Sequence, residues 1–210
     1  MRLRYKEWAM PELEENDLIY FDPKDLKGNW KRLFDNDNPI HLEIGAGKGK
    51  FLTLISKRNP DINYIAVEME AGAFVYAARL FKESGQENIR GIKTKAQNLA
   101  DYFDEDEIDK IYINFCNPWP KNRQHKRRLT HPRQLEVYKN FLKKGAEVDL
   151  KTDDLDFFED SIDYFKDHGF EVVEIDYDLD AEKDGNIVTE YEGKWRSRGI
   201  KIKYLKAIRI

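Results

Sequence analysis

Apolar and polar positions along the chain follow two periodicities, one typical of strands and one typical of helices, and segments of the two kinds alternate. Alternating or continuous apolar segments predict strands over residues 40–44, 62–67, 89–94, 111–115, 146–150, 170–175 and 200–205. Apolar residues three or four positions apart predict helices around residues 51–55, 74–81, 132–143 and 155–165. Alternation of strand and helix predicts an α/β fold with a mostly parallel, seven-stranded sheet covered on both faces. Since no helix is expected between the last two strands, an antiparallel strand is predicted near the C-terminus.

The length of 210 residues suits one domain, with an N-terminal extension over residues 1–35 and an insertion over residues 178–199 before the last strand. The chain has no run of about 18 apolar residues, and its first residues lack the apolar core of a secretory signal. One cysteine, Cys116, and four histidines without ligand-like spacing argue against a disulfide framework and a metal site. We therefore expect a cytoplasmic protein with no membrane and no metal partner, either a monomer or a homodimer.

Charge is segregated along the chain, although the net charge is only −4. Residues 121–133 and 194–209 are rich in lysine and arginine and contain no acid, and Arg2, Arg4 and Lys6 form a third basic group. Such segregation is typical of a surface that binds a polyanion, and a solvated charged face is the alternative. The candidates for RNA contact are Arg123, Lys126, Arg127 and Arg128.

A glycine-rich segment, Glu43-Ile44-Gly45-Ala46-Gly47-Lys48-Gly49, follows the first predicted strand and opens a helix. Its glycine spacing fits neither a phosphate-binding P-loop nor the G-x-G-x-x-G fingerprint of dinucleotides. Glu43 would repel a pyrophosphate and suits a cationic ligand such as S-adenosylmethionine, which carries an ammonium and a sulfonium. Glu68 ends the next strand, where a carboxylate can accept hydrogen bonds from ribose hydroxyls. A glycine-rich turn with two structural acids is the plainer alternative.

The segment Asn114-Phe115-Cys116-Asn117-Pro118-Trp119-Pro120-Lys121 follows the fourth predicted strand. Ligands of open α/β sheets bind at the carboxyl ends of strands, so this turn is expected beside the reactive end of the cofactor. Two prolines stiffen the turn, and Trp119 supplies a face on which a flat substrate can stack. The basic run begins directly at Lys121, although a proline-rich turn with a core tryptophan is an alternative.

Five segments together resemble the bacterial tRNA (guanine-N7-)-methyltransferases over nearly the whole chain. They are EIGAGKGKF (43–51), Glu68, NFCNPWPKNRQHKRRL (114–129), KTD (151–153) and NIVTEYEGKW (186–195). The resemblance implies a class I S-adenosylmethionine-dependent methyltransferase fold, which is Rossmann-like, and residues 1–210 as a single methyltransferase domain. It also implies S-adenosyl-L-methionine as methyl donor, tRNA as partner, and the guanine at position 46 of the variable loop as target.

Residue roles follow from the resemblance by position. It implies a catalytic role for Asn117. It implies cofactor contacts by Glu43, Gly45, Gly47, Gly49, Glu68, Lys95, Ala96 and Asn117. It implies substrate contacts by Lys121, Asp153, Thr189, Glu190, Tyr191 and Glu192. The family usually has Asp at the positions of Lys95 and Asn117; since a lysine cannot accept from the adenine amino group, Gln97, Asn98 or a backbone carbonyl is a candidate for that contact.

Guanine N7 carries a lone pair and no proton, so no base is needed before methyl transfer. Positioning of the guanine against the methyl group is therefore expected to contribute more than acid–base catalysis. The opposite edge of guanine carries donors and suits a carboxylate, for which Asp153, Glu190 and Glu192 are candidates. Two other functions stay open. One is an N6-adenine methyltransferase, because Asn117-Pro118 is similar to an N-P-P-aromatic motif; the other is a nonenzymatic RNA-binding protein with a vestigial donor pocket. A dinucleotide oxidoreductase is a more distant alternative.

Overall fold

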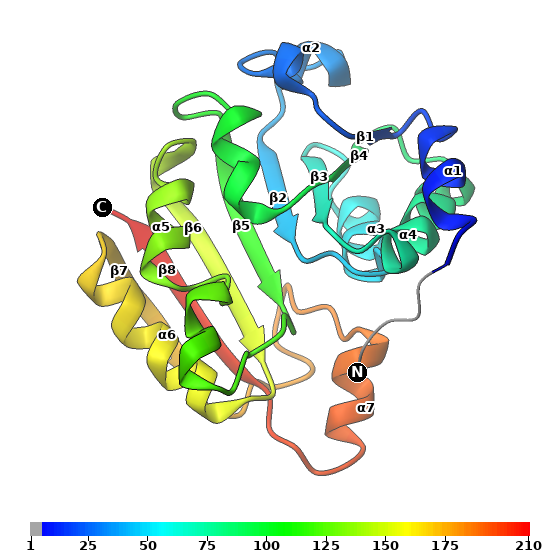
Figure 1. Cartoon of the computed structure of the whole chain (residues 1–210). Coiled ribbons are helices and arrows are strands. Elements are labelled where there is room, and N and C mark those ends of the chain that lie inside the picture. Colours follow the sequence, from blue (N-terminus) through cyan, green and yellow to red (C-terminus); the bar gives the residue numbers. More distant parts are fainter. Residues whose placement is uncertain (1–5) are drawn as a thin grey trace. The chain divides into compact units, whose positions relative to one another are not determined.

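The computed structural model describes residues 6–210, so Arg2 and Arg4 of the third basic group lie outside the described residues (Figure 1). The chain divides into two compact units at Asp104 and Glu105. We call them the N-terminal unit and the C-terminal unit and describe each by itself. The expectation of one domain stays a prediction.

A parallel sheet forms the centre of the N-terminal unit, with strands in the order β1-β4-β3-β2. Its strands are β1 (Ile19–Tyr20), β2 (Ile40–Ile44), β3 (Asn63–Glu68) and β4 (Ile89–Lys93). Its helices are α1 (Ala9–Glu14), α2 (Trp30–Phe34), α3 (Lys50–Arg58) and α4 (Ala71–Ser84), with 3₁₀ turns η1 (Lys24–Leu26) and η2 (Ala96–Asp101). The apolar stripe on α4 is buried, as its spacing predicts, and includes Phe74, Ala78 and Phe81.

The N-terminal extension takes part in this sheet through β1, which pairs with β4 in parallel. A two-residue strand leaves no alternation to detect, and β1 brings the strands among residues 6–210 to eight instead of the predicted seven. The extension is also anchored by Trp30, which is fully buried and donates from Nε1 to the Tyr102 carbonyl at 2.9 Å.

The C-terminal unit contains the predicted antiparallel strand. Here β5 (Ile108–Asn114) and β6 (Leu142–Thr152) are parallel, and β8 (Lys203–Arg209) is antiparallel to both β6 and β7 (Phe170–Asp176). Its helices are α5 (Pro132–Tyr138), α6 (Leu155–Asp167) and α7 (Glu190–Arg196), with the 3₁₀ turn η3 (Asn122–Arg127). The expectation of a mostly parallel sheet with an antiparallel C-terminal strand is confirmed.

The largest differences from the prediction in this unit concern two boundaries and one helix. The helix expected over 132–143 ends at Tyr138, because Leu142 pairs with Ile108 and begins an eleven-residue strand. The last strand begins at Lys203 rather than at residue 200. Helix α7 lies between β7 and β8, where no helix was expected; its seven residues carry too few apolar positions for a helical period to stand out.

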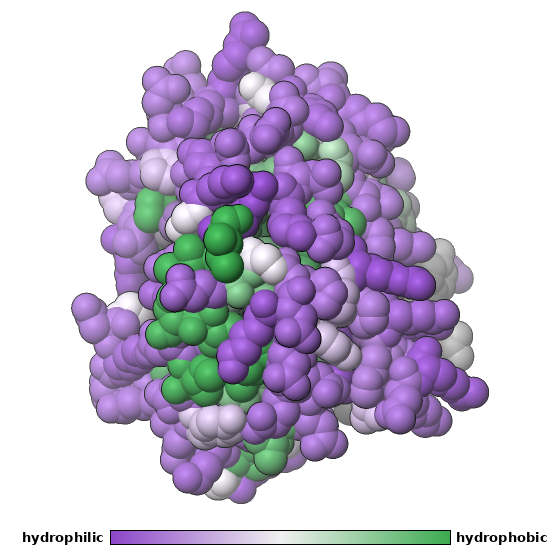
Figure 2. All heavy atoms as spheres, turned by 90° about the vertical axis from the view of Figure 1, so that its left-hand side faces the viewer, coloured by the Kyte–Doolittle hydropathy of each residue, from purple (hydrophilic) through white to green (hydrophobic). Residues whose placement is uncertain are grey.

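Strand β7 has β8 as its hydrogen-bonded neighbour in the described sheet and carries exposed apolar side chains, including Val173 and Ile175. Seen from the side where β7 and the C-terminus lie in Figure 1, apolar atoms gather in a strip between hydrophilic ones (Figure 2). A β-bulge between Val172 and Glu174 interrupts the pairing with β8. Bulges and charges on an edge strand oppose pairing with other chains.

The turn between β2 and α3 is packed closely against α4 at Gly49. This residue has a φ of 75°, and a Cβ atom built on it would lie 2.7 Å from both Ala77 Cβ and Phe81 Cε1. Both the left-handed backbone and the short approach therefore require glycine.

We expect Gly49→Ala to lower the free energy of unfolding by about 2–4 kcal/mol, because left-handed strain and overpacking add. Gly85→Ala is the matched control: its φ is 64°, but no atom lies within 4 Å of the added Cβ. It is expected to cost about 1 kcal/mol. Urea unfolding of the two variants measures the difference, and equal losses would show that packing against α4 is unimportant.

Candidate active site

The loop between β2 and α3 exposes backbone at the carboxyl end of the N-terminal unit's sheet. Gly45, Gly47 and Gly49 all have positive φ, at 84°, 56° and 75°. The N–H groups of Gly45 and Ala46 donate to the Val67 carbonyl at 2.8 and 3.1 Å, which holds the loop to the end of β3. The glycines thus form a tight turn without side chains in front of a helix N-terminus, as the sequence predicts.

The carboxylate of Glu68 is fixed by three backbone N–H groups. Its Oε2 accepts from Gly47 at 3.0 Å, and its Oε1 accepts from Met69 and Glu70 at 2.8 Å. Because a carboxylate has about four acceptor positions, it retains capacity for a donor from a ligand. The side chain is half-buried and its orientation is set in advance, which suits recognition of hydroxyl groups.

Strand ends bring three other predicted cofactor residues, Glu43, Lys95 and Ala96, to the same edge of this unit, whereas the predicted cofactor residue Asn117 lies in the C-terminal unit. Glu43 is buried near the end of β2, and the Thr94 N–H donates to the Glu68 carbonyl at 3.1 Å after β4. Ala96 is also buried, whereas the Lys95 side chain is exposed. Two carboxylates beside a glycine turn suit a cationic ligand with hydroxyl groups better than a phosphate.

In the C-terminal unit, the turn after β5 contains two non-glycine residues in left-handed conformation, Phe115 with a φ of 50° and Trp119 with a φ of 46°. Asn117 is exposed between them, and its Oδ1 accepts from the Trp119 N–H at 3.0 Å. Left-handed bulky residues are uncommon and cluster at functional sites. The turn therefore has a defined shape that the Asn117 side chain helps to fix.

Arg128 departs from its expected role as an RNA contact. It is 2% exposed, its Nε donates to the Pro118 carbonyl at 2.7 Å, and its Nη1 is paired with Asp160. Its guanidinium also lies 5.4 Å from the centre of the Phe157 ring. Arg128 therefore fastens the proline-rich turn to α6.

The other basic residues of the run are on the surface. The exposed members are Lys121, Arg123, Lys126, Arg127 and Arg133. Arg127 lies over Trp119, with Cζ 5.0 Å from the ring centre. In the second run, by contrast, Arg196, Lys201 and Lys206 are paired with acids of the same unit, which favours a structural role there.

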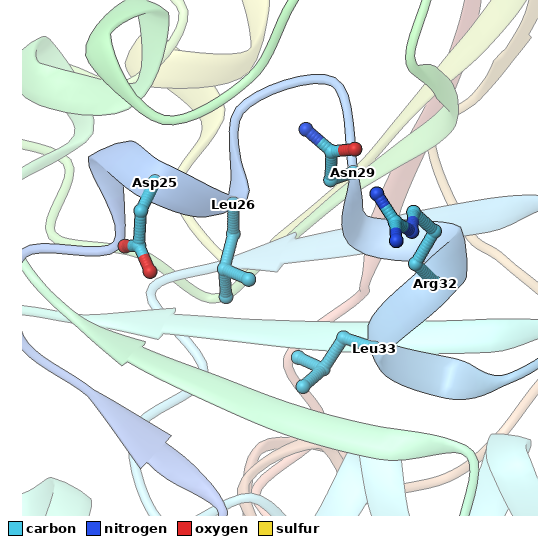
Figure 3. A pocket seen from close by; sticks show the side chains of 5 residues that line it. All are labelled: Asp25, Leu26, Asn29, Arg32 and Leu33. Carbon is cyan, nitrogen blue, oxygen red and sulfur yellow. The ribbon is translucent and has the colours of Figure 1, made fainter.

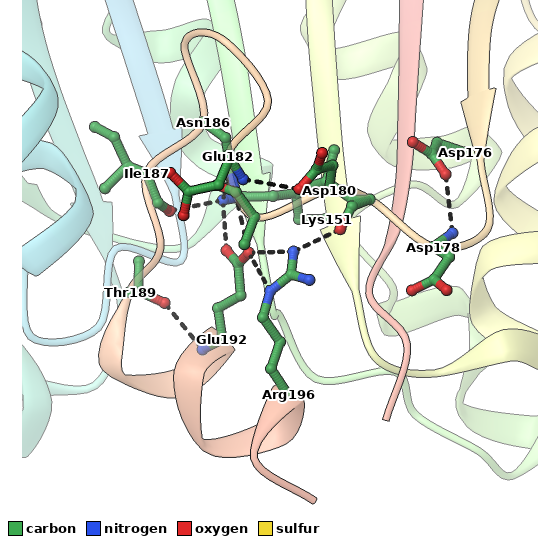
Figure 4. Close-up of polar contacts among 12 residues, drawn as sticks. Lys151, Asp176, Asp178, Asp180, Glu182, Asn186, Ile187, Thr189, Glu192 and Arg196 are labelled. Atoms are coloured by element: carbon green, nitrogen blue, oxygen red, sulfur yellow. Dashed lines mark hydrogen bonds and ion pairs between the residues drawn. The ribbon is translucent and has the colours of Figure 1, made fainter. Parts of the chain in front are cut away.

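A buried ion-pair network joins β6 to α7 (Figure 4). Lys151 Nζ donates to Glu192 Oε2, to the Ile187 carbonyl and to Asn186 Oδ1, all at 3.0–3.1 Å. Glu192 Oε1 accepts from Nε and Nη2 of Arg196 at 2.9 and 2.7 Å. Glu192 has no exposed surface, so this expected substrate contact is placed inside the unit.

Helix α7 presents its remaining residues differently. Thr189 caps the helix, with Oγ1 accepting from the Glu192 N–H at 3.2 Å, whereas Glu190 and Tyr191 are exposed. The Tyr191 ring lies 5.2 Å from that of Phe115, so α7 and the proline-rich turn are neighbours. Asp153 is half-buried, and burial raises the pKa of its carboxyl, an effect that the Lys203 ammonium opposes.

Sequence reasoning missed Lys151, Arg196 and Phe115 as parts of this site. Lys151 directly follows the predicted strand 146–150, and β6 carries other charged residues, so the sequence pattern holds no signal that this lysine is buried. Cys116 lies in the same turn, and burial raises the pKa of its thiol to about 12, which keeps it protonated at neutral pH.

The cavity of the N-terminal unit does not belong to the candidate site. A cavity of about 420 Å³ in the N-terminal unit is lined by residues of η1, α2 and their connection, and by none of the predicted site residues (Figure 3). Between residues 6 and 210, no three His, Cys, Asp or Glu side chains gather in a way that suits a metal ion. None of the helices there has the length and apolar composition that a membrane crossing requires.

Comparison with solved structures shows the fold. A structure described as an antibiotic-related methyltransferase matches with a TM-score of 0.65 and 16% identity, covering 89% of this chain and 94% of the other. The 16S rRNA methyltransferase KamB matches with a TM-score of 0.66 and 15% identity, over 87% and 94% of the two chains. The chain thus has the class I, Rossmann-like methyltransferase fold, as expected.

Comparison with sequences identifies the family. A family model described as "Putative methyltransferase" matches residues 37–205. The tRNA (guanine-N(7)-)-methyltransferase of Clostridium botulinum (strain Hall) is 48% identical over 214 residues, 99% of each chain. The enzyme of the same name from Clostridium tetani is 48% identical over 208 residues, again 99% of each chain. With nearly half of its residues shared along its whole length, the chain belongs to the family of tRNA (guanine-N7-)-methyltransferases.

Proposed function

We propose that the protein transfers the methyl group of S-adenosyl-L-methionine to N7 of guanine in tRNA, at position 46 of the variable loop. The full-length similarity to enzymes named for this reaction carries the proposal. The two units contribute different parts, with donor binding assigned to the N-terminal unit and substrate binding to the C-terminal unit. The substrate and a single cysteine also support a cytoplasmic location.

Donor binding is assigned to the glycine loop, Glu43 and Glu68. When bound, S-adenosylmethionine supplies an electrophilic methyl group on a sulfonium centre. The braced carboxylate of Glu68 suits ribose hydroxyls, because three backbone N–H groups already fix its orientation. Glu43 supplies negative charge for a cationic ligand, and the glycines leave the backbone open for close approach.

Substrate binding is assigned to Lys121, Asp153, Glu190 and Tyr191, which are exposed or half-buried. A carboxylate of Glu190 or Asp153 matches the N1–H and N2 amino donors of guanine, and Tyr191 and Trp119 offer ring faces. Thr189 and Glu192 contribute indirectly, because they set the start and the attachment of α7. Arg123, Lys126 and Arg127 are the proposed phosphate contacts.

Asn117 is assigned an orienting role. Guanine N7 attacks with a lone pair, so no base has to remove a proton before methyl transfer. The side-chain oxygen of Asn117 already fixes the turn at Trp119, and its amide NH₂ is a donor that suits the O6 acceptor of guanine, which leaves the N7 lone pair free to attack.

The first test is nucleoside mass spectrometry on unmodified tRNA incubated with donor and each protein. Wild type is expected to yield N7-methylguanosine. Asn117→Asp should stay active because it keeps the acceptor for the Trp119 N–H, and Asn117→Ala should lose at least tenfold in kcat. N6-methyladenosine would instead identify the adenine alternative, and no product with retained tRNA binding would identify the nonenzymatic one.

Donor binding is tested by titration calorimetry without tRNA. Glu68→Ala removes the charged acceptor and is expected to weaken S-adenosylmethionine binding by about 1.5–3 kcal/mol. Glu70→Ala is the control, because it removes an exposed carboxylate two residues away. Equal affinities of the two variants would contradict the assignment of Glu68.

The basic run is tested by comparing neighbouring arginines. Arg127→Ala should weaken tRNA binding and lower the salt slope by up to about 0.9, with unchanged thermal stability. Arg128→Ala should instead lower the free energy of unfolding by about 1–3 kcal/mol, because Asp160 and the Pro118 carbonyl lose their partner. An unchanged salt slope in Arg127→Ala would mean that this run is a solvated face.

A further inference from the structure

An aromatic and cationic face lies where the start of α1 meets α4 in the N-terminal unit, and it reaches the glycine loop at Lys48. Neither the donor nor the substrate assignments use its aromatic residues. It consists of Lys6, Trp8, Lys48, Tyr76 and Arg79, and we call it the α1–α4 face. Trp8 is 43% exposed, and its ring meets that of Tyr76 edge to face at a centroid distance of 6.1 Å. An exposed tryptophan held by neighbours is a ready stacking platform.

Three cations surround the two rings. Lys6 Nζ lies 4.1 Å from the Tyr76 ring centre, where it donates to the hydroxyl oxygen at 2.9 Å. Arg79 Cζ lies 4.8 Å from the Trp8 ring centre, and Lys48 Nζ lies 5.5 Å from the Tyr76 ring centre. Cations at these distances are attracted to the ring faces and hold the aromatic side chains in place.

The charge of the face is positive. Glu12 is the acid that pairs with Arg79, with Nη2 and Oε2 2.6 Å apart, and it neutralises that guanidinium. Lys48 is exposed, and Lys6 donates its described hydrogen bonds to neutral oxygens, at Gly72 and Tyr76. Lys6 and Lys48 therefore supply positive charge beside the exposed indole, while Glu83 near Arg79 and the exposed Glu7 are the further acids of this region.

Packing of α1 on α4 does not by itself require this arrangement. The side of α1 that is buried carries Ala9 and Leu13, both with no exposed surface. A tryptophan that served only to hold the helix would be expected among these residues rather than at the surface. The exposed indole is therefore available for a ligand with a flat face.

The face is continuous with the donor loop, because Lys48 lies between Gly47 and Gly49. A ligand with both negative charges and flat rings matches this surface, and a nucleic acid strand has both. We propose that the α1–α4 face is a second tRNA-binding surface, on which a base stacks on Trp8 and a phosphate pairs with Lys48. This proposal rests on the proposed function, since tRNA is the nucleic acid that the enzyme would hold.

The test is direct binding of a labelled, unmodified tRNA, measured by fluorescence anisotropy over a range of salt concentrations. Trp8→Ala is expected to weaken binding about tenfold, and Trp8→Phe, which keeps a ring, less than threefold. Tyr177→Ala is the matched control, because Tyr177 is 47% exposed in the C-terminal unit, and it should change binding less than twofold. Lys48→Ala should reduce the salt slope by up to about 0.9.

Wild-type affinity in Trp8→Ala, with donor affinity and thermal stability unchanged, would overturn the proposal. If Trp8→Ala fails to fold, Trp8→Phe and Lys48→Ala decide, and wild-type affinity and salt slope in both would overturn it. Equal weakening by Trp8→Ala of binding to tRNA and to polyglutamate would also overturn it, because stacking requires bases. Weaker tRNA binding in Trp8→Ala with no N7-methylguanosine from wild type would support this face while contradicting the proposed reaction.

Discussion

A buried ammonium group needs a negative partner, and the attachment of α7 in the C-terminal unit is organised around this need at Lys151. Its strand position is fixed by pairing with Asn114 on β5 and Tyr204 on β8. Its amine is then satisfied by Glu192 and by two oxygens of the segment before α7. A seven-residue helix is too short to be stable alone in water, so α7 depends on this attachment. The exposed residues Glu190 and Tyr191 thus lie on a helix whose position is fixed by the ion pair between Glu192 and Lys151.

In the basic run, too, one residue stabilises the structure and its neighbour is exposed to solvent. Arg128 is buried and bonded to Asp160 and the Pro118 carbonyl, whereas its neighbour Arg127 is exposed and lies over Trp119. Adjacent residues of one charge thus serve two purposes, one fixing a strained turn and the other leaving a cation at the surface. In the N-terminal unit, backbone N–H groups rather than side chains do the holding, since they fix the carboxylate of Glu68.

The residue pattern predicted strands β2 to β8 and helices α3 to α6 in their order, because the buried faces of these elements impose a period on the sequence. The glycine loop and Glu68 were predicted together, since both follow strands whose carboxyl ends meet at one edge. The sequence could not show which charged residues are buried. Arg128 and Glu192 resemble ordinary surface charges in the sequence, because their partners Asp160 and Lys151 are distant along the chain. Strand β1 and helix α7 were missed because they are held by tertiary contacts and have little local signal of their own.

The position of β8 between β6 and β7 has a consequence for biosynthesis. As the chain leaves the ribosome, β6 and β7 are both made before the strand that joins them. Until β8 emerges, β6 lacks its antiparallel neighbour, and β7, with its exposed Val173 and Ile175, has no strand to pair with. Unpaired strand edges are sites of misassembly during synthesis. The sheet of the C-terminal unit is therefore completed late, when β8 enters between β6 and β7.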